Sequence, residues 1–206
     1  MWWRELEQRP AASDPSLPAE DALQIHPTAE IAADAHFDTS KGPIVIGPRT
    51  RVCHGAFIMG PVRIGADCTV GNLAMIRGET TIGDGVRIGF ATENKYAIIE
   101  QEVTIGPQCF VADSKIERDA YLGAQVRTSN HRLDGRTIEV LVDGQRVDTG
   151  LEKLGCLVGR GSALGIQVVV LPGRVVAPGS IFAPKTIVER NLPTGRYRLA
   201  QQLETF

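Results

Sequence analysis

A six-residue repeat of β-branched residues constrains this chain more than any other feature. Eight positions spaced six residues apart, from Ile46 to Ile88, all hold isoleucine or valine. The residue after each is often glycine, and the fourth residue after each is small or β-branched. A period of six fits neither a 3.6-residue helix nor a long alternating strand. It fits a short strand and a turn, stacked in coils with the aliphatic side chain inward.

The repeat also defines the expected domain organisation. It extends over 25–192, weakly at first, and is interrupted at 128–156. Within the interruption, two strand-like runs flank Asp143-Gly144, a pair typical of a two-residue hairpin turn. Residues 1–24 are expected to form an arm, with a short helix at 2–8, and a linker, and 193–206 a tail with a short helix. Trp2 and Trp3 are expected to cover the open first coil. Insertions that break a repeat often carry function.

This pattern resembles the hexapeptide-repeat acyltransferases, which are left-handed parallel β-helices. The resemblance implies an all-β fold with three repeats per coil, an inserted loop and hairpin, and a homotrimer with sites between neighbours. Handedness and coil size come from the resemblance, because the spacing alone does not define them.

Composition narrows the functional classes. Lysine and arginine total 22 against 24 aspartate and glutamate, and this balance disfavours a nucleic-acid binder. No apolar run has the roughly 20 residues of a membrane helix, and no secretory leader is expected, so we predict a cytoplasmic protein with no membrane partner. The four cysteines form no C-x-x-C pair, and the histidines include no closely spaced pair, so no metal is expected.

The C-terminal half resembles a narrower group. The runs from Asp148 to Gly159 and from Ile187 to Pro193 are similar to the acetyltransferase half of bifunctional sugar-1-phosphate nucleotidylyltransferases. That resemblance implies acetyl transfer from acetyl-CoA to glucosamine 1-phosphate. No glycine-rich phosphate loop precedes the repeats, so nucleotidyl transfer is not expected. The resemblance places Arg77 and Lys95 as phosphate ligands and Asn130 in the acceptor loop, chemistry that suits a sugar phosphate. These cations are equally interpretable as solvated surface charges.

The same resemblance fails at the catalytic positions. The histidine of that group falls on Pro107, its neighbouring tyrosine on Phe110, and a further asparagine on Tyr121. Proline cannot accept a proton, so the mechanism of that group cannot operate unchanged. A catalytically inactive, trimeric sugar-phosphate binder or scaffold is therefore the alternative to an enzyme.

A second histidine offers a different base. His131 lies in Thr-Ser-Asn-His-Arg-Leu-Asp, which resembles the loop of maltose and galactoside O-acetyltransferases. There a histidine takes the proton of a sugar hydroxyl, a group that is a weak nucleophile without such help. Asp134 is expected to orient the ring. The alternative is that His131 is a loop histidine without a catalytic role.

Four further cations complete the candidates. Arg160, Lys185 and Arg190 are candidates for the phosphates of acetyl-CoA, by charge and location only. Arg174 occupies a repeat position that is elsewhere small or apolar. Because a buried unpaired guanidinium is costly, Arg174 is expected either to turn outward or to pair with an acid or a bound phosphate.

Overall fold

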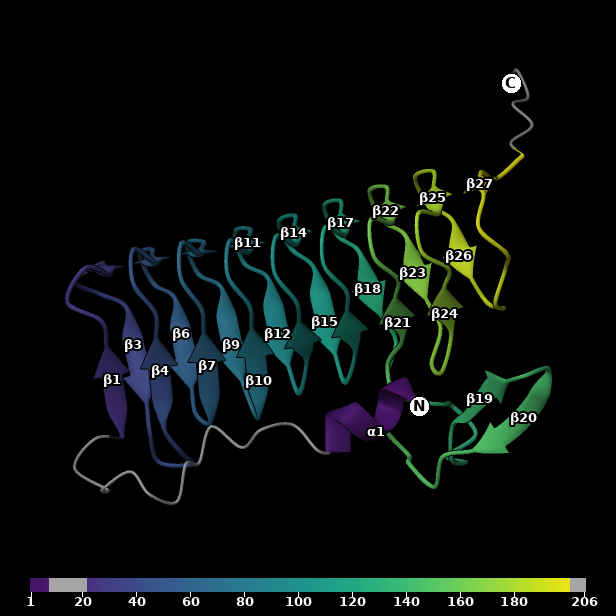
Figure 1. Ribbon diagram of the computed structural model, residues 1–206, viewed down its shortest axis with the longest axis horizontal. Coiled ribbons are helices and arrows are strands. Elements are labelled where there is room, and N and C mark those ends of the chain that lie inside the picture. The colour runs from purple at the N-terminus through teal and green to yellow at the C-terminus, as the bar shows by residue number, and fades with distance from the viewer. Residues whose placement is uncertain (8–21, 201–206) are drawn as a thin grey trace, which may run out of the picture.

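The computed structural model describes residues 1–7 and 22–200, and shows a row of stacked coils (Figure 1). Three parallel sheets run along the row, and strands from the three sheets alternate along the chain. The all-β class and the left-handed parallel β-helix of hexapeptide repeats are confirmed. Within the described residues, the helix α1 (Trp2–Glu7) and a hairpin are the elements outside the three sheets.

The strands of each sheet are short and follow one another at intervals of one coil. The first sheet contains β1 (Leu23–Ile25), β4 (Ile44–Ile46), β7 (Val62–Ile64), β10 (Thr80–Ile82), β13 (Ile98–Ile99), β16 (Lys115–Ile116), β21 (Leu157–Val158) and β24 (Val175–Val176). The second contains β2 (Glu30–Ile31), β5 (Arg51–Val52), β8 (Thr69–Val70), β11 (Arg87–Ile88), β14 (Thr104–Ile105), β17 (Tyr121–Leu122), β22 (Ala163–Leu164), β25 (Ile181–Phe182) and β27 (Arg196–Tyr197). The third contains β3 (His36–Asp38), β6 (Phe57–Met59), β9 (Met75–Arg77), β12 (Glu93–Lys95), β15 (Phe110–Ala112), β18 (Arg127–Thr128), β23 (Val169–Val170) and β26 (Ile187–Val188).

The core consists of inward-facing side chains that stack in register from one coil to the next. Ile46 pairs in register with Ile64, which pairs with Ile82, so one coil contains three six-residue repeats. All three side chains are at most 2% exposed. Burial of one such side chain stabilises the fold by about 1.5–3 kcal/mol, and β-branched residues lose little rotamer freedom there. The predicted inward row and three-repeat coil are confirmed.

Two coils are one residue shorter than the others. Ile82 pairs with Ile99 and Ile99 with Ile116. In both coils the missing residue falls at the corner between the third and first sheets, hereafter the third-to-first corner. Asn94 takes the inward position of the third sheet in the first of these coils and is fully buried. The one-residue shortenings between Ile88 and Ile99 and between Ile105 and Ile116 therefore both arise at this one corner.

The inserted segment follows β18 on the same corner. It forms a loop and then an antiparallel hairpin of β19 (Glu139–Val142) and β20 (Gln145–Asp148), as expected. The helix α1 packs Trp3 and Leu6 against the hairpin side chains Ile138 and Val140. The expectation that Trp2 and Trp3 cover the first coil is therefore wrong, because both pack in the apolar cluster of the hairpin, and α1 lies beside the hairpin (Figure 1).

The last described coil continues the second sheet. Tyr197 in β27 stacks on Phe182 with ring centroids 4.9 Å apart. The described part of the tail therefore adds a strand instead of the expected helix, and residues 201–206 lie outside the described residues. Within the described residues, no helix is long and apolar enough to cross a bilayer.

Candidate functional site

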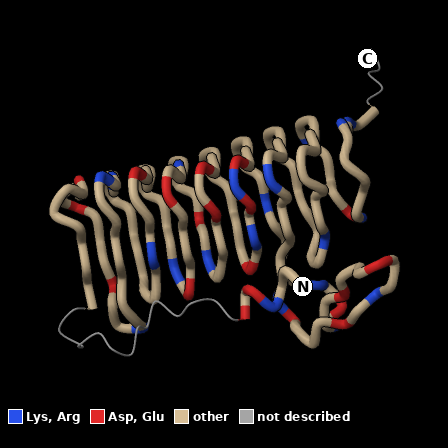
Figure 2. Tube along the Cα trace, in the orientation of Figure 1, with Lys and Arg blue, Asp and Glu red and all other residues tan. Residues whose placement is uncertain are grey.

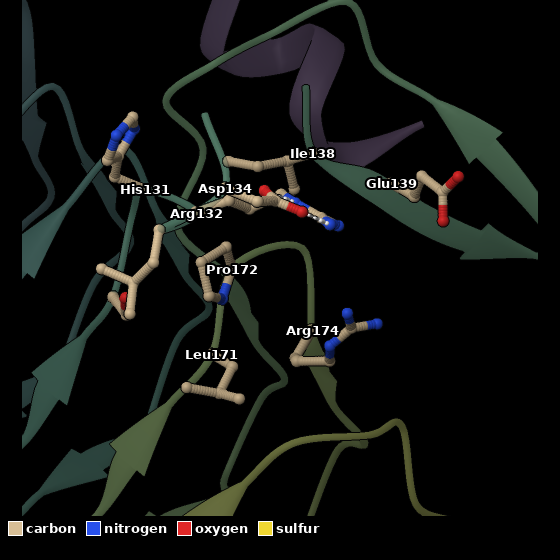
Figure 3. Close-up of a pocket in the computed structure, with 10 residues that line it drawn as sticks. His131, Arg132, Asp134, Ile138, Glu139, Leu171, Pro172 and Arg174 are labelled. Atoms are coloured by element: carbon tan, nitrogen blue, oxygen red, sulfur yellow. Dashed lines mark hydrogen bonds and ion pairs between the residues drawn. The ribbon is translucent and has the colours of Figure 1, made fainter. Parts of the chain in front are cut away.

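A cavity of about 570 Å³ lies between the inserted segment and the turn that joins β23 to β24. Both parts of its wall leave the third sheet at the third-to-first corner. The close-up shows the Arg132–Asp134 pair and Pro172 in the middle of the lining residues, with His131 and Arg174 at opposite ends (Figure 3). The lining consists of Ser129, His131, Arg132, Leu133, Asp134, Ile138, Glu139, Leu171, Pro172 and Arg174.

The hairpin is seated on the coil at Gly173. This residue has a φ of 72°, and a Cβ built there would lie 2.5 Å from the carbonyl oxygen of Glu139. Only glycine accepts both the left-handed backbone and this close approach. The Leu171-Pro172-Gly173 turn therefore places Arg174 directly beside the hairpin.

His131 is exposed at the mouth of the cavity, and its ring is oriented by the backbone. Its Nδ1 lies 3.1 Å from the carbonyl oxygen of Glu152. A carbonyl oxygen can only accept a hydrogen bond, so Nδ1 carries the proton in this arrangement. The neutral ring then keeps a free lone pair on Nε2, which is the arrangement a general base requires.

Asp134 contacts Arg132 instead of His131. The Nε atom of Arg132 donates to Oδ1 at 2.8 Å, and Nη2 contacts Oδ2 at 2.5 Å. This bidentate pair holds the pKa of the Asp134 carboxyl well below its usual range. The expectation that Asp134 orients the ring of His131 is corrected by this geometry, because a guanidinium two residues away is a better-matched partner for a carboxylate.

The expected acceptor-binding residues lie along the third-to-first corner, Arg77 and Lys95 on successive coils and Asn130 two coils beyond Lys95. Arg77 and Lys95 occupy the same register position on β9 and β12. Asn130 donates through Nδ2 to Asp113, whose backbone N–H in turn bonds to the carbonyl of Lys95. The structure therefore brings Arg77, Lys95 and Asn130 to one edge, and His131 follows Asn130 directly.

Arg77 and Lys95, like Asn130, already have partners. Arg77 forms an ion pair with Glu93 at 2.6 Å, and both side chains are about one-third exposed. The ammonium of Lys95 lies over the ring of Phe110, 5.8 Å from its centroid. Phe110 therefore supports a cation from its ring face, a role that does not need the hydroxyl of a tyrosine.

The expected donor-binding cations do not form one cluster. Arg160 lies at the corner after β21, Lys185 at the corner before β26, and Arg190 at the corner after β26. These are three different corners, and all three residues are exposed. In the orientation of Figure 2, acidic and basic residues are interspersed along the coils instead of forming a face of one sign.

Arg174 lines the cavity without an ion pair among the described residues. Its Nε atom is buried and has no hydrogen-bond partner there. Burial lowers the pKa of its guanidinium, and repulsion from Arg146 and Arg132 lowers it further. Arg174 is half-buried and has no acid partner among the described residues, so the expected pairing with a bound phosphate stays a prediction.

Two residues of the site were not predicted. Arg132 was not singled out as the partner of Asp134, and Glu152 acts through a backbone carbonyl, which no side-chain pattern reveals. Among the described residues, no three His, Cys, Asp or Glu side chains gather as metal ligands would. Burial raises the pKa of the Cys156 thiol to about 12, so this cysteine is no nucleophile near neutral pH.

Comparisons with known proteins agree with the repeat. Residues 61–93 match the family model described as bacterial transferase hexapeptide (six repeats). The chain is 51% identical over 203 residues to YaiX, an uncharacterized acetyltransferase of Escherichia coli (strain K12), covering 98% of this chain and 88% of that protein. It is 31% identical to a bifunctional sugar-1-phosphate nucleotidylyltransferase/acetyltransferase of Sulfurisphaera tokodaii, covering 76% of this chain and 39% of that protein.

A solved structure shares the fold. The acyltransferase LpxA of Bacteroides fragilis, which is described as a UDP-N-acetylglucosamine acyltransferase, superposes with a TM-score of 0.56. The two sequences are 13% identical, and the match covers 84% of this chain and 68% of that one. At this identity the likeness concerns the fold alone.

Proposed function

This chain belongs to the hexapeptide-repeat acetyltransferases, and from that premise we propose that it transfers an acyl group from an acyl-CoA donor to a sugar or sugar phosphate. The proposed donor is acetyl-CoA and the proposed assembly a homotrimer. The cytoplasm is the proposed location. The nucleotidylyltransferase activity in the name of the Sulfurisphaera relative is not part of the proposal, because this chain covers 39% of that protein.

The observation that carries the proposal is the orientation of His131. Its Nδ1 is engaged by the Glu152 carbonyl, which leaves Nε2 free to accept a proton at the mouth of the cavity. A sugar hydroxyl placed there would lose its proton to Nε2 while its oxygen bonds to the thioester carbon. The carbon–sulfur bond breaks, and the proton then passes to the leaving thiol. Every bond and proton in this exchange is accounted for without a metal.

The edge beside His131 supports an acceptor that carries negative charge. Arg77 and Lys95 lie on successive coils of the same corner, and Asn130 lies two coils beyond Lys95. A phosphate bound there would compete with Glu93 for Arg77, so recognition would exchange one ion pair for another. A hydroxyl acceptor fits His131 better than the amine of glucosamine 1-phosphate, because the base of that reaction is replaced by Pro107.

The donor site is less defined. Arg160, Lys185 and Arg190 remain individual candidates for the donor phosphates, since they lie on three corners. Arg190 shares the third-to-first corner with His131, which makes it the best placed of the three. Asp134 acts in this proposal through Arg132, by holding the loop next to His131.

The test is thiol release from acetyl-CoA with a panel of sugars and sugar phosphates. His131→Ala is expected to reduce turnover by about 10²–10⁴-fold, the usual contribution of a general base, with little change in melting temperature. His26→Ala is the matched control, because His26 lies on the first coil and its ring hydrogen-bonds to the nearby Thr28 side chain.

Three outcomes would contradict parts of the proposal. Full activity of His131→Ala would remove its role as base. Efficient acetylation of glucosamine 1-phosphate would show that another group serves the reaction. No turnover with any acceptor, in a folded protein, would favour the inactive binder or scaffold.

A further inference from the structure

Arg174 is unusual for its place in the repeat. The equivalent residues of other coils on the third-to-first corner, among them Thr80, Ser114 and Cys156, are buried and small. Arg174 instead extends a long cationic side chain from this corner into the cavity. A residue that only had to complete the corner would not need a guanidinium, so its charge requires another explanation.

The acids around Arg174 are already engaged. Asp134 is held by two contacts from Arg132, and Glu139 pairs with Arg146 at 3.3 Å. Among the described residues no carboxylate lies within ion-pair distance of Arg174, and its Nε is buried without a partner. Arg174 as a whole is half-buried, but a guanidinium nitrogen that has lost water without gaining a partner is unfavourable by itself.

The surroundings add positive potential to this position. Burial lowers the pKa of the Arg174 guanidinium, and repulsion from Arg146 and Arg132 lowers it further, against the attraction of Glu139. Arg136 lies with Arg132 and Arg146 on the adjoining cavity of the hairpin. An anion at Arg174 would therefore reduce the repulsion among these cations. It would also accept a hydrogen bond from the buried Nε of Arg174.

We propose that Arg174 is the centre of a binding site for a phosphate-sized anion, at the hairpin end of the cavity and separate from the Arg77–Lys95 edge. A guanidinium offers a planar fork that matches two oxygens of a phosphate. The anion belongs either to the acceptor or to the CoA donor, and only this assignment rests on the proposed function. The site itself requires no turnover.

Inorganic phosphate is the probe for the site. We expect saturable phosphate binding by calorimetry, and a rise in melting temperature with phosphate, in the wild-type protein. Arg174→Val should weaken binding by about tenfold or more and lose the phosphate-dependent rise. In phosphate-free buffer the same variant should be as stable as the wild type or more stable, because it removes an uncompensated charge.

Two variants keep the test specific. Arg87→Val removes an exposed cation from β11 on the second sheet and should bind phosphate like the wild type. Arg174→Lys keeps the charge but loses the fork, so it should bind with intermediate strength. Equal phosphate binding by Arg174→Val and the wild type would overturn the site, as would the absence of any phosphate effect on the wild type.

The source of the anion and the proposed function are tested separately. If Arg174→Val weakens CoA binding as much as phosphate binding, the site holds a donor phosphate. If CoA binding is unchanged, the site holds an acceptor group, and either result supports the anion site. His131→Ala should retain phosphate binding, so a failed acyl-transfer assay leaves this measurement interpretable.

Discussion

At the scale of single residues, two polar side chains in the inward row of the third sheet should respond in opposite ways to valine. Asn94 is fully buried, and neither side-chain polar atom has a partner among the described residues. Thr128 is equally buried, but its hydroxyl accepts a hydrogen bond of 2.8 Å from the backbone of Ala112. We expect Asn94→Val to stabilise the protein by roughly 1–3 kcal/mol and Thr128→Val to destabilise it by a similar amount, because only the second leaves a buried donor unpaired. Urea unfolding measures both, and a less stable Asn94→Val would indicate an internal water or another partner for the amide.

At the scale of elements, the helix α1 should hold the hairpin beside the cavity. Trp3 is 4% exposed and packs with Ile138 and Val140, and Glu5 reaches Lys115 at 2.6 Å. We expect Trp3→Ala to cost about 3 kcal/mol of this local packing and to speed amide exchange in 138–142 by up to about 100-fold. Exchange in the coil core should stay as in the wild type, since that core packs without the helix. Glu7→Ala, an exposed change on the same helix, is the control, and unchanged exchange at the hairpin in Trp3→Ala would show that α1 does not support it.

At the scale of the whole molecule, an apolar row along the corner between the second and third sheets supports the proposed homotrimer. Phe90, Pro107, Ala124 and Ile166 occupy equivalent places on successive coils, and Phe90 and Ile166 are 47% and 44% exposed. Apolar rows of this kind are typical of association surfaces. Sedimentation at micromolar concentration should therefore show a trimer, which Phe90→Asp should weaken, whereas Leu199→Asp on the tail should not. A wild-type monomer would contradict the assembly, and a trimeric Phe90→Asp would move the interface elsewhere.

The sequence predicted the solenoid because its core residues recur at a fixed spacing along the chain. An inward position recurs every six residues, and the residue there is buried each time. The aliphatic residues spaced six apart from Ile46 to Ile88 therefore indicate the stacked-coil fold. The register of Arg77 beside Lys95 follows from the same counting, since equal repeat positions stack. The coil size and handedness needed the resemblance to known β-helices, because a six-residue period alone does not define how many repeats close a coil.

The partners of the site were decided only by the tertiary structure. Residues 128–156 carry no repeat, so nothing in their spacing indicates that Asp134 contacts Arg132 while His131 contacts the Glu152 carbonyl. The docking of α1 depends on which apolar surface is available in space, and that surface belongs to a hairpin more than a hundred residues along the chain. For Arg174, the sequence and the tertiary structure each supplied part of the answer. Its repeat position made it conspicuous in the sequence, but the absence of an acid partner among the described residues required the folded surroundings, because pairing of a charge depends on neighbours that are distant along the chain.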